Sequence, residues 1–152
     1  MSEDHVCHAA ECPLPTEAGA DLCVLHVPRD GKAREPLLAA FKALDDAGII
    51  RIRDLYLVDA DLSGINLHLK NLQYSNLTGA SFQNARLNKV GFDFSKLDEI
   101  NFESAILEKC DLRRATSARN IRWFEVILDG VQIPSFSHVG LHSAYDDGQH
   151  AD

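Results

Sequence analysis

The feature that most constrains the fold is a run of twelve large apolar residues that recur at every fifth position. They are leucine or phenylalanine throughout: Leu57, Leu62, Leu67, Leu72, Leu77, Phe82, Leu87, Phe92, Leu97, Phe102, Leu107 and Leu112. A mostly small or branched residue stands two positions before each, as at Ala60 and Cys110, and Lys70 is the clear exception. A period of five fits neither the 3.6-residue repeat of an α-helix nor the two-residue repeat of a strand. The chain is therefore expected to turn a corner every five residues.

Four sides of five residues close one coil, and successive coils stack at about the 4.8 Å spacing of neighbouring strands. The large residue should point inward from the middle of each side, and the small residue should point inward near the corner. Grouping the positions by twenty then places Phe82 and Phe102 on one side and Phe92 on the opposite side. Each of these leucines and phenylalanines is interpreted as a core residue.

The five-residue register fails after Leu112 and resumes one residue late, at Ile121 and Trp123. An extra residue near positions 118–120 would absorb this slip as a bulge. Trp123 then falls on an inward position and is predicted to lie in the core.

Three stretches carry a resemblance to a known family: Ala60-Asp61-Leu62-Ser63-Gly64, Ala80-Ser81-Phe82-Gln83-Asn84 and Cys110-Asp111-Leu112-Arg113-Arg114. The pattern resembles the tandem motif A(D/N)LXX of the pentapeptide-repeat family, over roughly residues 54–133. The resemblance implies an all-β solenoid, a right-handed quadrilateral parallel β-helix of about four coils. It implies little about function, because members of one fold family perform unrelated tasks.

The two ends of a solenoid must be covered, since each exposes core and unpaired strand edges. Residues 31–53 are assigned to a capping helix and lead-in: Pro36 suits a first helical turn and Gly48 suits the stop. Residues 134–152 are assigned to a C-terminal cap followed by a disordered tail. Their apolar side chains are expected to fold over the last coil or to meet a second copy of the chain, which would form a homodimer; they are Phe136, Val139 and Leu141.

Residues 1–30 are predicted to form a small zinc-binding module. Cys7, Cys12, Cys23 and His26 follow one another with the spacing C-x4-C-x10-C-x2-H. Three thiolates and an imidazole are a normal tetrahedral zinc set, and a full set of four protein ligands favours a structural over a catalytic ion. The segment is poor in apolar residues, so a metal would supply its folding energy.

Alternatives to this set remain open. His5 or His8 could replace one ligand, and the segment could instead hold a catalytic Cys/His pair or a redox-sensitive loop. Arg29, Lys32 and Arg34 follow the cluster and form either a weak basic patch or a solvated linker. Cys110 differs from the other cysteines, because it occupies a small inward repeat position and is predicted to lie in the core.

Charge and composition restrict the class of function. The net charge of −8 argues against non-specific nucleic-acid or membrane binding. No basic region followed by an apolar run opens the chain, and no stretch approaches the roughly 18 apolar residues of a membrane span, so a cytoplasmic protein is expected. No phosphate-binding glycine loop, nucleophile motif or placed pair of carboxylates is present in the sequence, and the chain is predicted not to be an enzyme.

The outer surface offers columns of residues twenty apart. Tyr74 and Phe94 share one corner column with Arg114, and aromatic and arginine side chains are favoured at interface hot spots. They are the predicted interaction surface, although the two rings could simply stack and cover the corner. Lys89 and Lys109 share a second column with Leu69.

These observations predict a non-catalytic scaffold that binds an unidentified protein partner and carries a structural zinc ion. The alternative follows from the resemblance, since some relatives mimic DNA and modulate a type II topoisomerase such as gyrase. That role implies strongly acidic faces. Residues 54–133 carry 11 acidic and 9 basic side chains, which is close to balance.

Overall fold

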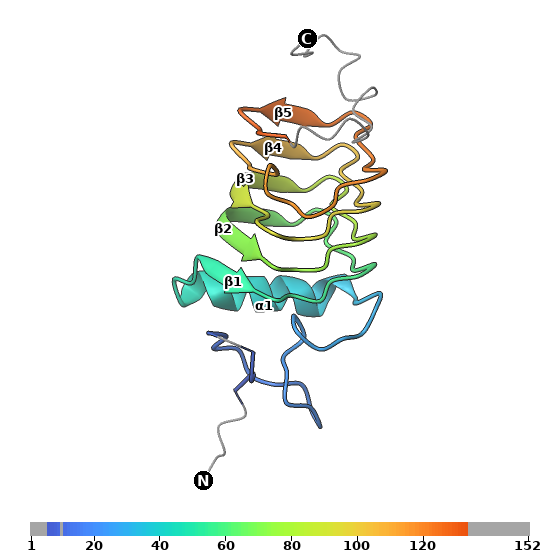
Figure 1. The fold of residues 1–152 in the computed structure, drawn as a ribbon. Coiled ribbons are helices and arrows are strands. Elements are labelled where there is room, and N and C mark those ends of the chain that lie inside the picture. The colour runs from blue at the N-terminus through green and yellow to red at the C-terminus, as the bar shows by residue number, and fades with distance from the viewer. Residues whose placement is uncertain (1–5, 10, 134–152) are drawn as a thin grey trace.

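Five short strands lie one above another in a single parallel sheet, ordered β1-β2-β3-β4-β5. In the computed structural model, which describes residues 6–9 and 11–133, they span Arg51–Arg53, Asn66–Gln73, Arg86–Gly91, Ile106–Glu108 and Ile127–Asp129. The strands share one side of a stack of coils, and Figure 1 shows the chain winding from one level to the next. The chain is therefore a parallel β-solenoid of about four coils, as predicted.

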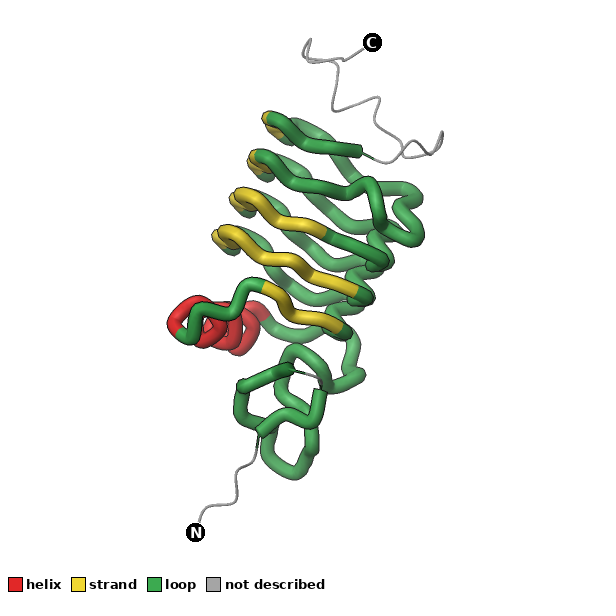
Figure 2. The backbone as a smooth tube through the Cα atoms, turned by 60° about the vertical axis from the view of Figure 1, so that its left-hand side comes forward, coloured by secondary structure: helices red, strands yellow, loops and turns green. Residues whose placement is uncertain are grey.

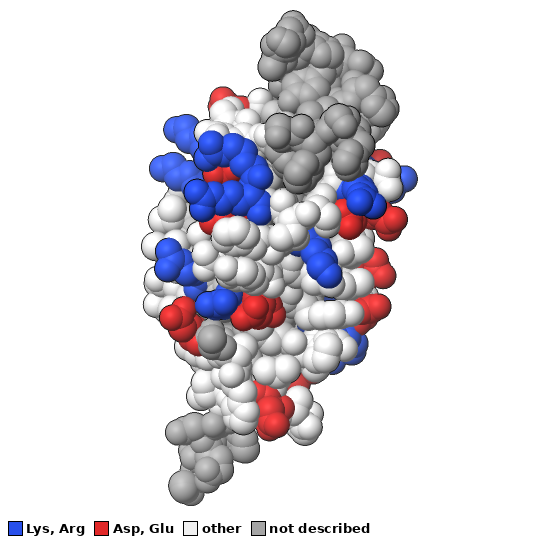
Figure 3. Space-filling model, viewed as in Figure 1, with Lys and Arg blue, Asp and Glu red and all other residues white. Residues whose placement is uncertain are grey.

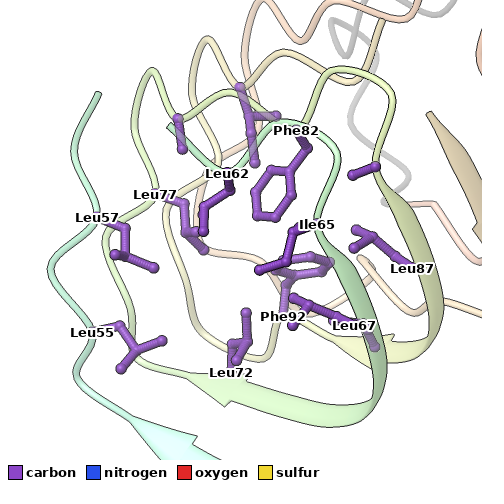
Figure 4. Close-up of a cluster of buried hydrophobic side chains, with 14 of the residues drawn as sticks. Leu55, Leu57, Leu62, Ile65, Leu67, Leu72, Leu77, Phe82, Leu87 and Phe92 are labelled. Atoms are coloured by element: carbon purple, nitrogen blue, oxygen red, sulfur yellow. The ribbon is translucent and has the colours of Figure 1, made fainter. Parts of the chain in front are cut away.

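The coils repeat at twenty residues because each has four five-residue sides. Leu67 pairs with Leu87, and Leu87 pairs with Leu107. Isolated bridges keep the same spacing on other sides, as between Asp61 and Ser81. All twelve leucine and phenylalanine positions of the repeat are buried, and Figure 4 shows ten labelled side chains of the core converging on the interior.

The corners are made by backbone conformation. The residue two positions after each large inward residue has a positive φ, from Asp54 to Gly130, with Arg114 as the exception and with Gly64, Gly79 and Gly130 at three of these places. Left-handed backbone costs an ordinary L-residue about 1–2 kcal/mol. The stacked hydrogen bonds of neighbouring coils hold this conformation at each corner, so the side chain there points outward and is free to vary.

Aromatic packing in the core follows the predicted sides. Phe82 and Phe102 are one coil apart, with ring centroids 5.6 Å from each other, and Trp123 continues the column at 5.5 Å from Phe102. Trp123 is 1% exposed, which confirms its inward position. Cys110 is fully buried as predicted, and burial raises the pKa of its thiol.

The predicted position of the register slip is wrong by a few residues. Gly91 pairs with Asp111, twenty residues on, whereas Lys96 already pairs with Ser117, twenty-one residues on. The extra residue therefore lies between Asp111 and Ser117 and not at 118–120. Among the described corners, Arg114 is the one whose φ is not positive, which is the local sign of this bulge. Ala118 takes the inward position that leucine holds elsewhere and is 1% exposed.

Helix α1 spans Arg34–Asp46 and lies across the first coil (Figure 1). Its core-facing residues are Leu37, Ala40, Phe41 and Leu44. The helix begins two residues before the predicted Pro36 and ends next to Gly48, whose φ is +72°. The predicted capping helix is thus present, and the predicted start was two residues late.

Lys70, the misfit of the repeat, lies where the first complete coil meets this helix. Its side chain is 4% exposed, and its ammonium bonds to the carboxylate of Asp45 on α1 and to the carbonyl of His68. A small apolar residue is not needed at this corner, because the neighbouring layer is the capping helix α1, called the lid below, and not another coil. The lysine fastens the lid to the solenoid.

No helix in the described part of the chain is long and apolar enough to cross a membrane. The predicted cap residues Phe136, Val139 and Leu141, and the homodimer expected through them, lie outside the described residues.

Candidate metal centre and the aromatic corner

The N-terminal segment brings its three cysteines and one histidine together at the foot of the solenoid. Cys7, Cys12, Cys23 and His26 each offer one ligand atom, and these atoms all lie within 4.8 Å of one another. All four side chains are buried, with exposed fractions of 5%, 5%, 1% and 5% in that order. The sequence spacing therefore predicted a real cluster. His8 is exposed and stands outside it, and His5 lies outside the described residues.

Local turns bring the ligands into place. Cys12 closes a turn by donating its N–H to the carbonyl of Ala9, and the Cys7 N–H donates to the carbonyl of Leu14. The His26 N–H donates to the carbonyl of Cys23, which puts both side chains of the C-x2-H pair on the same side. Gly19 supplies a positive φ in the loop between Cys12 and Cys23.

The distances between ligand atoms fit a tetrahedral ion. The Sγ atoms of Cys12 and Cys23 are 3.8 Å apart, and His26 Nδ1 lies 3.2 Å from Cys23 Sγ and 3.4 Å from Cys7 Sγ. A tetrahedron with zinc–sulfur bonds of about 2.3 Å has sulfur–sulfur edges of about 3.8 Å, and imidazole edges are slightly shorter. The four donors can thus hold a metal ion without moving far.

The protonation chemistry of the thiols also favours a cation. The contact with Cys23 lowers the pKa of Cys12, and the same contact together with burial raises the pKa of Cys23 to about 12. Two adjacent buried thiolates repel each other, so ionisation of one of these thiols opposes ionisation of the other. A divalent cation among them would remove this repulsion and allow all three thiols to ionise.

His26 connects the cluster to the solenoid. Its Nδ1 faces the sulfurs, while its Nε2 lies 2.8 Å from the carbonyl oxygen of Arg53 in β1. Burial lowers the pKa of His26, but the contacts with Cys23 and the Arg53 carbonyl outweigh it and the pKa is raised. A metal-binding histidine commonly donates its second ring N–H to a carbonyl, which sets its tautomer and orientation. No sequence signal pointed to Arg53, because any residue supplies a carbonyl.

The residues after the cluster extend the first coil. Tyr56 donates its N–H to the carbonyl of Leu25, and Asp61 donates its N–H to that of Lys32. The edge that a solenoid would otherwise leave unpaired is thus partly covered by the module, and α1 covers the rest. Figure 2 shows the module directly below the helix and first strand.

The prediction that Arg29, Lys32 and Arg34 form a basic patch or a solvated linker is wrong for Lys32, while the Arg29 side chain is 51% exposed. Lys32 is 2% exposed, and its ammonium donates to the Tyr56 carbonyl. Desolvation lowers its pKa to about 8. Arg29 forms two hydrogen bonds of 2.8 Å with the carboxylate of Glu17, and Arg34 donates to the Ser63 carbonyl. Lys32 and Arg34 thus link the N-terminal residues to the solenoid, whereas the Arg29–Glu17 pair lies within the module.

The predicted aromatic column exists at a corner of the solenoid. The rings of Tyr74 and Phe94 stack with centroids 5.1 Å apart and an interplanar angle of 19°. The guanidinium of Arg53 lies 4.9 Å from the Tyr74 ring centroid on the other side. Tyr74 and Phe94 remain 50% and 40% exposed, and the carbonyl of the exposed Arg114 accepts the Phe94 N–H from the next coil. The rings therefore stack on each other and still present their edges to solvent.

Fold and repeat together define the class of protein: a β-solenoid with a metal-ligand cluster attached to its first coil. Residues 56–92 and 71–103 match the family model of pentapeptide repeats, in eight copies. The match shows that residues 56–103 carry the repeats of this family.

Comparison with known proteins adds one structural likeness. The chain is similar to the crystal structure of a pentapeptide repeat protein, Rfr23, from the cyanobacterium Cyanothece 51142, with 21% identity and a TM-score of 0.30. The match covers 56% of this chain and 57% of that chain, so the two share little more than half of their lengths. A search of curated proteins found no match.

Proposed function

We propose that this protein is a non-catalytic interaction scaffold whose N-terminal module is folded around a structural zinc ion. The role of scaffold is supported by one observation above all: two stacked, half-exposed aromatic rings, Tyr74 and Phe94, stand on a core filled with side chains. Aromatic side chains held rigidly at low entropic cost are typical anchors of protein interfaces. The partner is a protein, and Arg114 lies at the end of the same column.

Zinc is the metal that the donor set favours. Three thiolates with one imidazole in tetrahedral geometry suit Zn²⁺, whereas carboxylate and water ligands would suit Mg²⁺ or Ca²⁺. Cys7, Cys12, Cys23 and His26 would hold the ion, and four protein ligands leave no position for a substrate. When bound, zinc would supply folding energy to a segment that has few apolar residues of its own.

Metal analysis of the purified full chain tests the zinc site directly. The expected result is one equivalent of zinc per chain, released by a mercury reagent that titrates thiols, and its loss in Cys23→Ser. Absence of zinc from protein whose four thiols are still reduced would refute the site.

The scaffold role is tested by capture of partners from the source cells on immobilised protein. A specific partner should bind the wild type and be lost with Tyr74→Ser/Phe94→Ser. Phe124→Ser is the matched control, because Phe124 is a 57% exposed aromatic residue away from this corner. Equal capture by all three proteins would refute the role of the Tyr74–Phe94 corner.

The alternative of DNA mimicry finds no favouring observation in the described residues. Basic side chains interrupt the acidic ones along the solenoid, with ion pairs between Arg113 and Asp111 and between Arg122 and Glu103. Figure 3 shows Lys and Arg side chains gathered at the upper left of the viewed face. A gyrase supercoiling assay with micromolar protein should accordingly show no inhibition.

A further inference from the structure

One face of the solenoid differs from the rest of this acidic protein. It lies between the corner column Leu69–Lys89–Lys109 and the corner column Tyr74–Phe94–Arg114, and we call it the Asn71 face. Its outward positions are set by the register of Arg51 with Asn71, of Asn71 with Gly91, and of Gly91 with Asp111. The two columns noted separately in the sequence are therefore the two borders of a single surface.

The Asn71 face carries a local excess of positive charge. With its borders it holds six basic residues, Arg51, Arg53, Lys89, Lys109, Arg113 and Arg114, against three acidic ones, Asp54, Asp93 and Asp111. This is a net of +3 on a chain whose net charge is −8. Asp54 and Asp111 are already engaged by Arg53 and Arg113, while Lys89 and Lys109 form no ion pair within the described residues. The free charges on this surface are thus mainly cationic.

The middle of the face is hollowed, because Gly91 has no side chain to fill its place in the column. The hollow is lined by Asn71, Lys89, Gly91, Asp93 and Asp111. Asn71 Oδ1 is buried here and has no hydrogen-bond partner in the described part of the chain, and a Cβ at Gly91 would lie 3.4 Å from it. A buried acceptor without a donor is costly, so the hollow suits a group that brings an N–H.

A second, mainly apolar depression adjoins the first toward the lid. Ile50, Leu69 and Lys70 line both, and the second continues to Gly48 and Ile49, with Asp45, the ion-pair partner of Lys70, and His68 as its polar lining. Ile50 and Leu69 are 50% and 42% exposed, although both are large aliphatic residues. The two depressions form one groove, apolar at the lid end and polar at Gly91, beside a row of cations.

We propose that the Asn71 face binds an acidic peptide segment of a partner protein that carries an aliphatic anchor residue. The carboxylates meet Lys89 and Lys109, the anchor enters the Ile50–Leu69 depression, and the peptide backbone lies over the hollow at Gly91. A nucleic acid fits less well, because its phosphates donate no hydrogen bond and would approach Asp93 and Asp111. This inference rests on the proposed scaffold function and names the partner chemistry of a surface that borders the Tyr74–Phe94 corner.

The test uses fluorescence anisotropy with the full-length protein and a labelled twelve-residue peptide of glutamate and leucine. The matched probe has glutamine in place of every glutamate. The glutamate peptide should bind the wild type about tenfold more tightly than the glutamine peptide. Raising the salt from 0.05 to 0.5 M should weaken it, because salt screens exposed charges. Equal affinity for the two peptides overturns the proposal.

Lys89→Glu/Lys109→Glu changes the face from +3 to −1 and should weaken glutamate-peptide binding by about tenfold or more. Folding is preserved, because Glu99 already occupies an equivalent corner at φ +61°. Lys96→Glu is the control, since Lys96 is exposed on a different side and should change affinity less than about twofold. Equal weakening by Lys96→Glu would show attraction to the whole molecule and overturn the proposal.

Two further binding measurements would identify a different ligand of the Asn71 face. Tighter binding of a single-stranded DNA twelve-mer, lost in Lys89→Glu/Lys109→Glu, would make the face a nucleic-acid surface and overturn the inference. Residues after Ile133 include three aspartates and no lysine or arginine. If the glutamate peptide binds only to a chain that ends at Ile133, residues 134–152 occupy the face in the full-length protein. That result would overturn the proposal of a partner peptide. If the Lys89→Glu/Lys109→Glu variant still captures the native partner, the Asn71 face is not the binding surface, but the proposed scaffold function is not affected.

Discussion

Removal of the Asp45 carboxylate should destabilise the protein through Lys70. The Lys70 side chain is 4% exposed and that of Asp45 is 50% exposed, so Asp45→Ala leaves a buried ammonium with the His68 carbonyl as its remaining partner, 3.4 Å away. Breaking a fully buried ion pair costs about 3–5 kcal/mol. A charged hydrogen bond with one half-exposed partner contributes about 1.5–3 kcal/mol. We expect a loss of about 2 kcal/mol in the free energy of unfolding, taking the lower range because water screens Asp45.

The assay is urea denaturation at pH 7, supported by thermal melting, where about 2 kcal/mol corresponds to roughly 4–8 °C for a chain of this size. The control is the double variant Asp45→Ala/Lys70→Met. It should regain most of the loss, because an apolar side chain at position 70 needs no counter-charge. If Asp45→Ala is within about 0.5 kcal/mol of the wild type, or if the double variant is no more stable than Asp45→Ala, the account of Lys70 as a fastening of the lid is wrong.

Four further outcomes are expected. Chelation of the metal, or Cys23→Ser, should unfold the module and lower the melting temperature of the whole chain through the His26–Arg53 contact; a melting curve unchanged by chelation would contradict that link. Phe102→Ala should cost about 3–5 kcal/mol in urea denaturation because Phe82 and Trp123 both lose an aromatic neighbour, while Phe124→Ala, at an exposed aromatic, should cost under about 1 kcal/mol. Gly79→Ala should cost at least about 1–2 kcal/mol, because its φ is +71° and the added Cβ would displace the Asp59 carboxylate, whereas Ala80→Gly removes only a methyl group. Burial holds the pKa of Lys32 at about 8, below its usual 10.5. The unfolded chain therefore binds more protons between these pH values, and the free energy of unfolding should rise from pH 8 to 10.5 by up to about 3 kcal/mol. Lys32→Met should remove this part of the pH dependence.

The sequence predicted the solenoid residue by residue, because a five-residue period has one structural solution. Leu67 and Leu87 needed no tertiary information to be placed inside and in register. The bulge was misplaced because Ser117 and Ala118 are both small, so side-chain size does not show where the extra residue lies. Backbone pairing of Lys96 with Ser117 decides it.

The candidate site was predicted only in part. The spacing of Cys7, Cys12, Cys23 and His26 predicted the buried cluster that could hold a metal ion, because thiols and imidazoles carry their chemistry in their identity. Lys32 was misread, since a lysine in a polar segment normally faces water and only the fold shows the carbonyl that it meets. The hollow at Gly91 was missed for a similar reason: a glycine in a strand is visible, but the unpaired oxygen of Asn71 beneath it belongs to the neighbouring coil.

The four-sided coil also determines how such a protein can change its length. Insertion or deletion of a whole coil of twenty residues leaves every column continuous and keeps the Cys/His cluster on the same side as before. Insertion of a single pentapeptide is equally compatible with the core, yet it rotates everything beyond it by a quarter turn. The angle between the N-terminal module and the far end of the stack is thus adjustable in 90° steps. Five residues of sequence can therefore change the relative direction of two sites on this scaffold without a hinge.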